Sequence, residues 1–203
     1  MQRSPPTRRL LLAGGLAAIA APVLAQNRAP RTATGLITAA RAQVGVTTGY
    51  DPAYVRLGFP GGDVERGTGV CTDVLVRAYR DAFGLDLQAL VNADMRATFS
   101  TYPRRWGLTK TDSNIDHRRV PNLQVFFERA GGKLVVPASV EDWRPGDIFT
   151  SLIGGRLPHT GIVSDRVEGG RPLVIHNIGA GAREEDALTA YPITGRYRWA
   201  LEA

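Results

Sequence analysis

Cysteine is almost absent from this sequence: among 203 residues, Cys71 is the only one. A single cysteine cannot form an internal disulfide, so disulfides do not hold this fold together. In an exported chain, a lone cysteine indicates either pairing with another molecule or a reactive thiol. What Cys71 does therefore depends first on whether the chain is exported.

The sequence also lacks an apolar run of about 20 residues, the length that a transmembrane helix needs. Its apolar run, from Leu10 to about Ala21, follows three arginines and precedes the small residues Val23-Leu24-Ala25. This layout is typical of a secretory signal peptide, which we predict for residues 1–25. The pair Arg8-Arg9 fits a twin-arginine signal or an ordinary one. We expect an exported protein of the bacterial periplasm or cell envelope without a membrane span in its mature form; a retained N-terminal anchor is the alternative.

Runs of lysine and arginine are missing as well. The net charge is +6, but the basic residues are scattered and have no regular aromatic interleaving, so nucleic acid is not an expected partner. Part of the excess lies in the predicted signal peptide. The remaining excess is mild and compatible with an anionic polymer of the envelope.

Internal repeats and a second domain boundary are also lacking. We predict a flexible segment over 26–34 and one domain over 35–203. Helical patterns come first and strand patterns last, which favours an α+β fold with helices packed on a C-terminal antiparallel sheet. The predicted helices span 35–44, 71–83, 87–99 and 121–130, and the predicted strands span 147–151, 161–167, 173–178 and 193–199.

Cys71 begins the second of these helices. The unpaired N–H groups and the positive dipole end of a helix start lower the pKa of a thiol, so we expect an available thiolate. Val74, Leu75 and Ala78 share its helix face, which turns the thiol toward the sheet. The alternative is a small buried core residue.

Two of the three histidines lie in the predicted sheet region: His159 just before the strand over 161–167, and His176 within the strand over 173–178. If Gly169-Gly170 is a two-residue turn, Val163 pairs with His176, and His159 then faces the same side of the sheet. The two histidines would be offset by four residues, or about 13 Å. Contact between them needs a bulge or another register, and a slip of one residue presents Asn177 instead.

A cysteine at a helix start and a histidine on a facing strand form the nucleophile–base pair of papain-like enzymes. The base takes the thiol proton, and a third polar group holds the ring in the useful tautomer. His176 and Asn177 both have the chemistry of such a group.

Several motifs carry a resemblance to known families. PGDI, HTGIVS and LVIHN resemble the second half of NlpC-type cell-wall peptidases, and AARAQVGVTTGYDPAYV resembles their first helix and tyrosine-bearing loop. GVCTDVLVRAYR, DLQALV, SNIDHRRVPNL, GDI, PHTGIVS, HNIG and ITGRYR together resemble the bacterial family called domain of unknown function 1287, which is grouped with the papain-like superfamily. This second resemblance runs from about residue 40 to 200.

The resemblance implies a papain-like (NlpC-type) fold with Cys71 as nucleophile, His159 as base and His176 as third residue. Two departures stand out. Thr72-Asp73 follows the cysteine where NlpC-type enzymes have Ser-Gly, and Arg196 stands where the closer family leads us to expect histidine.

Other polar residues are candidates for supporting or binding roles. Asn177, Tyr54 and Asp73 are candidate supporting residues, although Asp73 also suits a helix cap and Tyr54 suits loop packing. The cluster before the last helix is either a clamp for a substrate carboxylate or a network at the helix start. Its members are Asp116, His117, Arg118 and Arg119.

The sequence favours an exported thiol hydrolase, a cysteine peptidase or amidase, that cleaves an amide bond in peptidoglycan stem peptides and needs no metal or cofactor. An acyltransferase follows the same steps with another acceptor. A zinc hydrolase using Cys71, His159 and His176 is an alternative, though the chain lacks a His-Glu-x-x-His motif. A non-catalytic envelope binding module is the other alternative, and the sequence gives no oligomeric state.

Overall fold

The computed structural model describes residues 1–2 and 30–202. The predicted signal peptide and the start of the 26–34 segment therefore lie almost wholly outside the described residues. In the part of the chain that is described, none of the helices has the length and apolar character needed to span a membrane.

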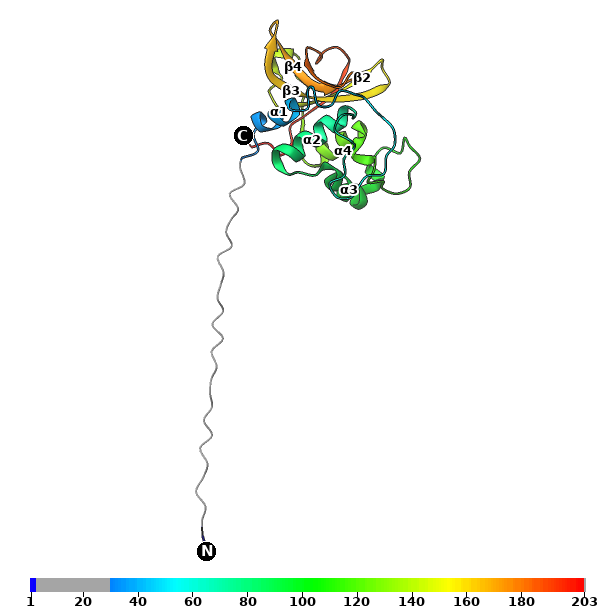
Figure 1. Cartoon of the computed structure of the whole chain (residues 1–203), viewed down its shortest axis with the longest axis vertical. Coiled ribbons are helices and arrows are strands. Elements are labelled where there is room, and N and C mark those ends of the chain that lie inside the picture. Colours follow the sequence, from blue (N-terminus) through cyan, green and yellow to red (C-terminus); the bar gives the residue numbers. More distant parts are fainter. Residues whose placement is uncertain (3–29, 203) are drawn as a thin grey trace.

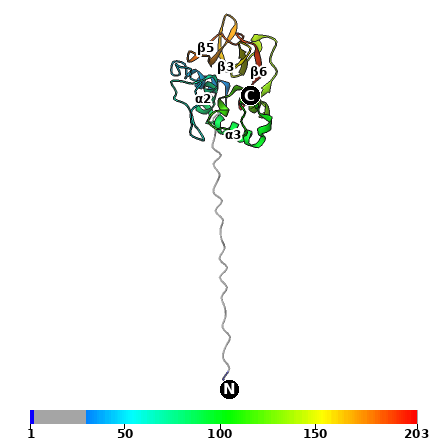
Figure 2. The same cartoon turned by 90° about the vertical axis from the view of Figure 1, so that its right-hand side faces the viewer.

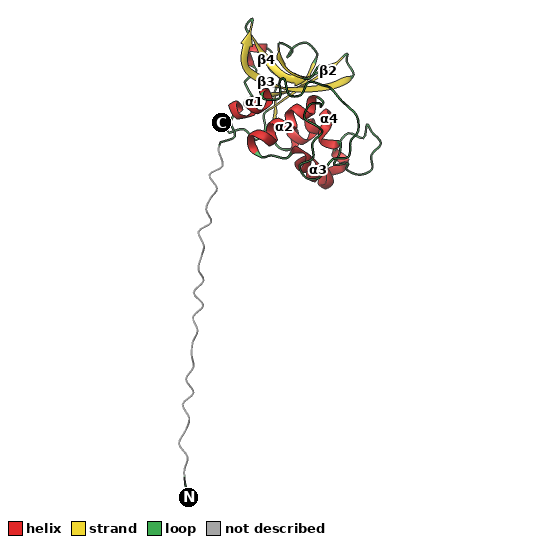
Figure 3. Ribbon diagram, in the orientation of Figure 1, coloured by secondary structure: helices red, strands yellow, loops and turns green. Residues whose placement is uncertain are grey.

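Helices come first along the chain and strands last, which confirms the predicted α+β order (Figure 1). The helices are α1 (Ala33–Arg41), α2 (Cys71–Phe83), α3 (Leu87–Thr98) and α4 (Val120–Arg129). The strands are β1 (Lys133–Leu134), β2 (Ile148–Ile153), β3 (Leu157–Glu168), β4 (Arg171–Asn177), β5 (Ala182–Glu185) and β6 (Ile193–Tyr197). Short 3-10 turns occupy Phe99–Thr101, Asp116–Arg118 and Val140–Asp142. Figure 3 shows the helices as a layer beneath the sheet.

The sheet is antiparallel throughout, in the order β1-β6-β2-β3-β4-β5. The last strand of the chain, β6, lies between β1 and β2, while β5 forms the opposite edge (Figure 2). The two edge strands, β1 and β5, were not predicted because both are very short and neither alternates apolar with polar residues. One side chain of β5 enters the candidate site.

Local signals at the helix ends explain most of the boundaries. Asp86 caps α3 by accepting the N–H of Gln88 (3.1 Å), and Gly84 ends α2 in the left-handed conformation (φ +66°). Thr32 caps α1, so this helix begins at Ala33 and ends at Arg41 rather than spanning 35–44.

Each face of the sheet carries its own apolar core. The face toward the helices contributes Ile148, Ile162, Ile175 and Tyr197 to the larger core. The opposite face contributes Phe149, Val163 and Val174, which pack against Trp143 and Leu188 from the connecting segments. Because side chains alternate along a strand, neighbouring positions of one strand serve different cores.

The β3–β4 hairpin is where the predicted register is partly wrong. Gly169-Gly170 has φ of +56° and +82°, as a two-residue hairpin turn requires, and the predicted pairing next to the turn is confirmed. Further along, Val163 pairs with Val174 and not with His176, because the register shifts between Val163 and Val167. This irregularity moves the two strands by two positions and decides which residues of the site meet.

Candidate active site

Cys71 is the first residue of α2, as predicted. The residue before it, Val70, is extended, and the carboxylate of Asp73 accepts the Val70 N–H at 2.7 Å. A side chain at Gly69 would approach the same carboxylate oxygen to 3.1 Å, so the small residue leaves room for this cap. The sequence GVCTD thus begins the helix with the thiol in its first turn.

The Cys71 thiol is buried, with 5% of the residue exposed. Burial raises the pKa of the thiol to about 12, although main-chain N–H groups, foremost that of Thr160, oppose this by pointing at the sulfur. The charge of Asp73 raises the pKa further. The predicted thiolate is therefore wrong for the resting protein: desolvation outweighs the helix start.

The two strand histidines are in direct contact. His159 Nε2 lies 2.8 Å from His176 Nδ1, and the rings cross edge to face. His176 Nε2 lies 2.9 Å from Oε1 of Glu185 on β5. These three side chains, called the His–His–Glu relay below, run from the start of β3 across β4 to the edge strand.

The relay fixes the protons on both rings. A carboxylate only accepts, so His176 Nε2 carries a hydrogen and donates it to Glu185. The other nitrogen of a neutral His176 ring then accepts, which makes His159 Nε2 the donor. His159 Nδ1 is left with its lone pair. Burial lowers the pKa of His176. Burial and the neighbouring His176 ring together lower the pKa of His159 to about 3. Both rings are therefore neutral near pH 7.

The register shift and one glycine bring the histidines together. With Ile162 opposite Ile175, Gly161 lies across from His176, so the two histidines are offset by two residues and not four. A Cβ on Gly161 would come within 2.8 Å of the His176 Cβ and 2.7 Å of Phe149. Only glycine leaves space for the contact. The shared face of the two histidines is a confirmed prediction.

The start of β3 brings the residues on either side of His159 to the thiol. The Thr160 N–H points at the sulfur, and Pro158 lines a cavity of about 190 Å³ together with Cys71. His159 lies between these two residues, with its ring on the same sheet face as Phe149. Among the described residues no hydrogen bond joins the thiol to the ring; catalytic hydrogen bonds are commonly long before substrate binds.

Asp73 and Arg118 form a buried ion pair beside the cysteine. Both carboxylate oxygens of Asp73 accept from the Arg118 guanidinium at 2.9 Å. The same guanidinium donates to the carbonyls of Asp51 and Ala53. Asp73 thus supports the start of α2, and Arg118 is occupied by the protein rather than free to clamp a substrate.

Asn177 is a neighbour of the relay and not a member. Its side-chain amide donates to the carbonyls of Gly49 and Gly69, at 3.0 Å each. It therefore ties two points of the loop between α1 and α2 to the end of β4, the second of them just before the cysteine. Between the two candidates for the ring's partner, His176 contacts His159.

The two tyrosines of the preceding loop have separate positions. Tyr54 hydrogen bonds to Asp112 (3.0 Å) and Asn114 (2.8 Å) and packs the loop. Tyr50 lines the cavity beside Cys71, and its pKa is raised to about 12 by burial and by the charge of Cys71. A phenol that stays protonated beside the thiol is a hydrogen-bond donor for a developing oxyanion.

The cluster 116–119 divides between the two predicted roles. Asp116 accepts the Asp112 N–H at 2.5 Å, and His117 is buried with Nδ1 unpartnered among the described residues. Burial lowers the pKa of His117 to about 4. Arg119 stacks over Trp106, 4.1 Å from the ring centroid, and both residues line the cavity.

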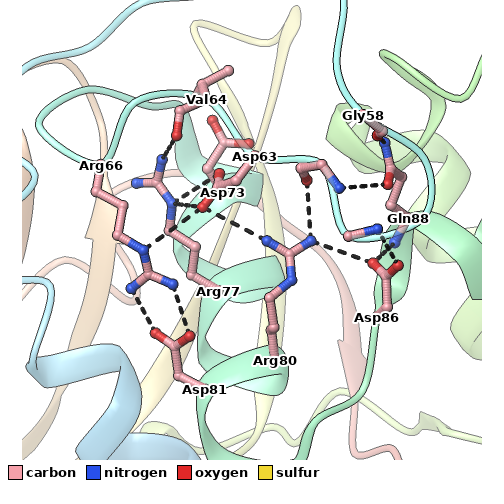
Figure 4. A network of polar contacts seen from close by, with 12 residues as sticks. Gly58, Asp63, Val64, Arg66, Asp73, Arg77, Arg80, Asp81, Asp86 and Gln88 are labelled. Carbon is pink, nitrogen blue, oxygen red and sulfur yellow. Dashed lines mark hydrogen bonds and ion pairs between the residues drawn. The ribbon is translucent and has the colours of Figure 1, made fainter.

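The long loop before Cys71 is held by side chains of α2 and α3 (Figure 4). Arg77 donates to both carboxylate oxygens of Asp63, at 3.1 and 3.0 Å, and Arg66 forms a bidentate pair with Asp81. Gln88 of α3 donates to the Gly58 carbonyl. The loop is thus fixed on the helices and gives the cavity a firm wall.

Arg196, at the position where histidine was expected, is part of a different structure. Arg196 and Arg198 both pair with the fully buried Asp147, at 2.6 and 2.8 Å. These pairs join β6 to the turn before β2 and are separate from the relay.

No group of three histidine, cysteine or acidic side chains among residues 30–202 is arranged to hold a metal ion. The facing nitrogens of His159 and His176 are engaged with each other, whereas shared zinc ligands direct their lone pairs at one point.

Glu185 and Trp106 are the site residues that sequence reasoning missed. Glu185 lies in the run Arg183-Glu184-Glu185, which has no strand pattern, so no sheet face was available to place it. Trp106 stands at the cavity with 38% of its surface exposed.

Comparisons with known proteins give one family and one similar protein. Residues 37–199 match the family described as "Domain of unknown function (DUF1287)". The "Uncharacterized protein YijF" of Escherichia coli (strain K12) is similar, with 47% identity over 179 residues that cover 88% of this chain and 86% of that protein.

Proposed function

The chain belongs to the DUF1287 family, whose description leaves the activity open, and from this premise we propose that it is a thiol hydrolase that cleaves an amide bond. Cys71 is the nucleophile and His159 the base in this proposal. The observation that carries the proposal is the His–His–Glu relay, because it leaves Nδ1 of His159 unprotonated. His159 is the neighbour of Thr160, whose main-chain N–H contacts the thiol.

The fold that goes with this activity is papain-like, of the NlpC type. Three features support it: the thiol at a helix start, a histidine near the start of a strand packed with that helix, and a polar partner for the ring on the next strand.

Acylation begins when substrate brings its carbonyl carbon to the Cys71 sulfur. His159 Nδ1 accepts the thiol proton as the sulfur–carbon bond forms, and the imidazolium then protonates the amine that leaves. The Cys71 N–H and the Tyr50 phenol are the donors available to the oxyanion. In the second half, water loses a proton to His159 and attacks the thioester, which releases a carboxylic acid and restores the thiol.

The Cys71 thiol and the His159 ring are both uncharged at rest. The attack is therefore general-base catalysis and not the reaction of a preformed thiolate–imidazolium ion pair. Burial raises the pKa of the thiol and lowers that of His159, and each shift disfavours the charged form. The relay becomes useful when His159 gains its proton, because His176 and the Glu185 carboxylate then stabilise the positive charge.

The substrate in this proposal is a stem peptide of peptidoglycan, and the protein acts in the periplasm or envelope after export. The predicted signal peptide over 1–25 and the motifs similar to cell-wall peptidases support this choice.

Digestion of purified peptidoglycan, with products identified by mass spectrometry, tests the proposal. Wild type is expected to release peptide fragments, while Cys71→Ala and His159→Ala release none. His117→Gln is the matched control, since His117 is buried like His159 but lies outside the relay, and it should digest like wild type. If wild type and Cys71→Ala give the same products, the hydrolase proposal is wrong and a non-catalytic binding module is favoured.

A further inference from the structure

The lining of the cavity beside the thiol includes a charged group that the protein itself hardly uses. Arg118 and Arg119 both line the cavity that contains Cys71. They differ in how their donors are occupied, and a guanidinium has five N–H donors. This difference points to which arginine meets a ligand.

Arg118 is satisfied by the protein. It donates to both oxygens of Asp73 and to two main-chain carbonyls, and its side chain is 2% exposed. The carboxylate of Asp73 balances its charge, so Arg118 supports the wall without presenting a free donor face.

Arg119 makes one long hydrogen bond within the described residues, to Asp116 at 3.3 Å. Its guanidinium lies over the Trp106 ring, and its side chain is 16% exposed. The ring holds the planar group by cation–π contact while leaving its N–H edges available. Because Trp106 and Arg119 both line the cavity, these edges are presented where a substrate lies.

We infer that Arg119 binds a carboxylate of the substrate, and that the cavity therefore favours substrates with a free carboxylate close to the scissile amide. A guanidinium fork and a carboxylate form paired, charge-assisted hydrogen bonds. Asp116 orients Arg119 from one side, and Trp106 from its face. Arg104 and Arg105, exposed beside Trp106, do not line the cavity and take no part in this contact.

This inference rests on the proposed function for its substrate, but its test does not require hydrolysis. Cys71, the only thiol, is alkylated with two matched reagents, N-iodoacetylglycine and its uncharged amide, N-iodoacetylglycinamide. The ratio of the two rates reports whether the cavity favours a carboxylate near the sulfur, since the intrinsic reactivity of the iodoacetyl group is common to both.

The acid-to-amide rate ratio is expected to be about tenfold higher in wild type than in Arg119→Gln, the size expected for a charged hydrogen bond at a partly exposed site. Arg119→Lys, which keeps the charge but not the fork, should fall between them. Arg105→Gln is the matched control, because it removes a neighbouring exposed charge that does not line the cavity, and it should leave the ratio unchanged.

Equal ratios in wild type and Arg119→Gln would overturn the inference, as would an equal fall in Arg105→Gln, which would indicate only the general field of the rim. If Arg119→Gln does not fold, Arg119→Lys decides: a ratio like that of wild type contradicts a bidentate site. These outcomes are independent of peptidoglycan digestion by Cys71→Ala, so failure of the inference is distinguishable from failure of the proposed function.

Discussion

Changing the hydrogen-bonding chemistry at position 185 is expected to move the resting proton of His159. The Glu185 carboxylate accepts from His176 Nε2 at 2.9 Å, and the chain of donors that follows leaves His159 Nδ1 unprotonated. Glutamine either accepts or donates at that point, and lysine only donates. In Glu185→Lys, His176 Nε2 must accept, so His176 Nδ1 donates and His159 carries its proton on Nδ1.

The size of the effect follows from the exposure of Glu185. Its side chain is 40% exposed, so its hydrogen bond to a neutral ring is worth about 1.4 kcal/mol, or a preference of about ten to one between the two tautomers. We therefore expect about nine-tenths of His159 in the active tautomer in wild type. About half is expected in Glu185→Gln and about a tenth in Glu185→Lys. Hydrolysis should fall at least in proportion, because the charge that stabilises the imidazolium is lost as well.

Long-range ¹⁵N–¹H spectra of the imidazole rings at pH 7 measure this directly, because protonated and unprotonated ring nitrogens resonate far apart. The chain has three histidines, so the spectrum contains few signals, and His159→Ala and His176→Ala assign them. Glu184→Gln is the matched control: its carboxylate pairs with Arg41 (2.7 Å), and the tautomers should be those of wild type.

A wild-type His159 ring protonated on Nδ1 would refute the assignment of the base. Identical spectra for wild type, Glu185→Gln and Glu185→Lys would show that Glu185 on the edge strand does not control the tautomer of His159.

Three further outcomes follow from buried groups. Alkylation of Cys71 by iodoacetamide should accelerate steadily from pH 5 to pH 9 without levelling, because burial raises the thiol pKa to about 12; a plateau reached below pH 8 would contradict this. Burial lowers the pKa of His117 in the folded protein from 6.5 to about 4. As the pH falls, the ring therefore binds a proton first in the unfolded protein, and the unfolding free energy that His117 contributes above pH 6.5 is lost toward pH 4. The loss of unfolding free energy between pH 7 and pH 5, measured in urea, should therefore be about 1–2 kcal/mol smaller in His117→Gln than in wild type, and equal losses would refute this. Arg118→Gln leaves the buried Asp73 carboxylate unpaired and should lower the unfolding free energy by about 3–5 kcal/mol, with a change below about 1 kcal/mol counting against the pair.

The order of elements could be predicted from the sequence because it depends on local patterns. Gly84 and Asp86 mark a helix end and a helix start through their own backbone and side-chain chemistry, and the Gly169-Gly170 turn defines a hairpin. Such signals need no knowledge of distant residues. The edge strands carry too few residues for a pattern, and their partners are remote in sequence.

The relay could be predicted only in part because register is a tertiary property. Alternation placed His159 and His176 on one face, but the shift between Val163 and Val167 that brings them into contact has no marker in the sequence. Glu185 enters the site from a strand that pairs with β4 only in the folded chain.

The charge state of Cys71 was predicted wrongly for a related reason. The helix start is visible in the sequence and favours a thiolate, whereas burial depends on the loops and strands packed around it. The partner of Asp73 shows the same limit, because the carboxylate pairs with Arg118, 45 residues away.

The most direct measurement is the intact mass of the protein after rapid acid quenching of its reaction with soluble peptidoglycan fragments. A thioester on Cys71 is expected: a mass increase equal to the acyl part of the cleaved fragment, located on the Cys71 peptide and removed by neutral hydroxylamine. The adduct should be missing from Cys71→Ala. Fragments left uncut by wild type, or cut equally by Cys71→Ala, would contradict the assignment of Cys71 as the nucleophile of a peptidoglycan hydrolase.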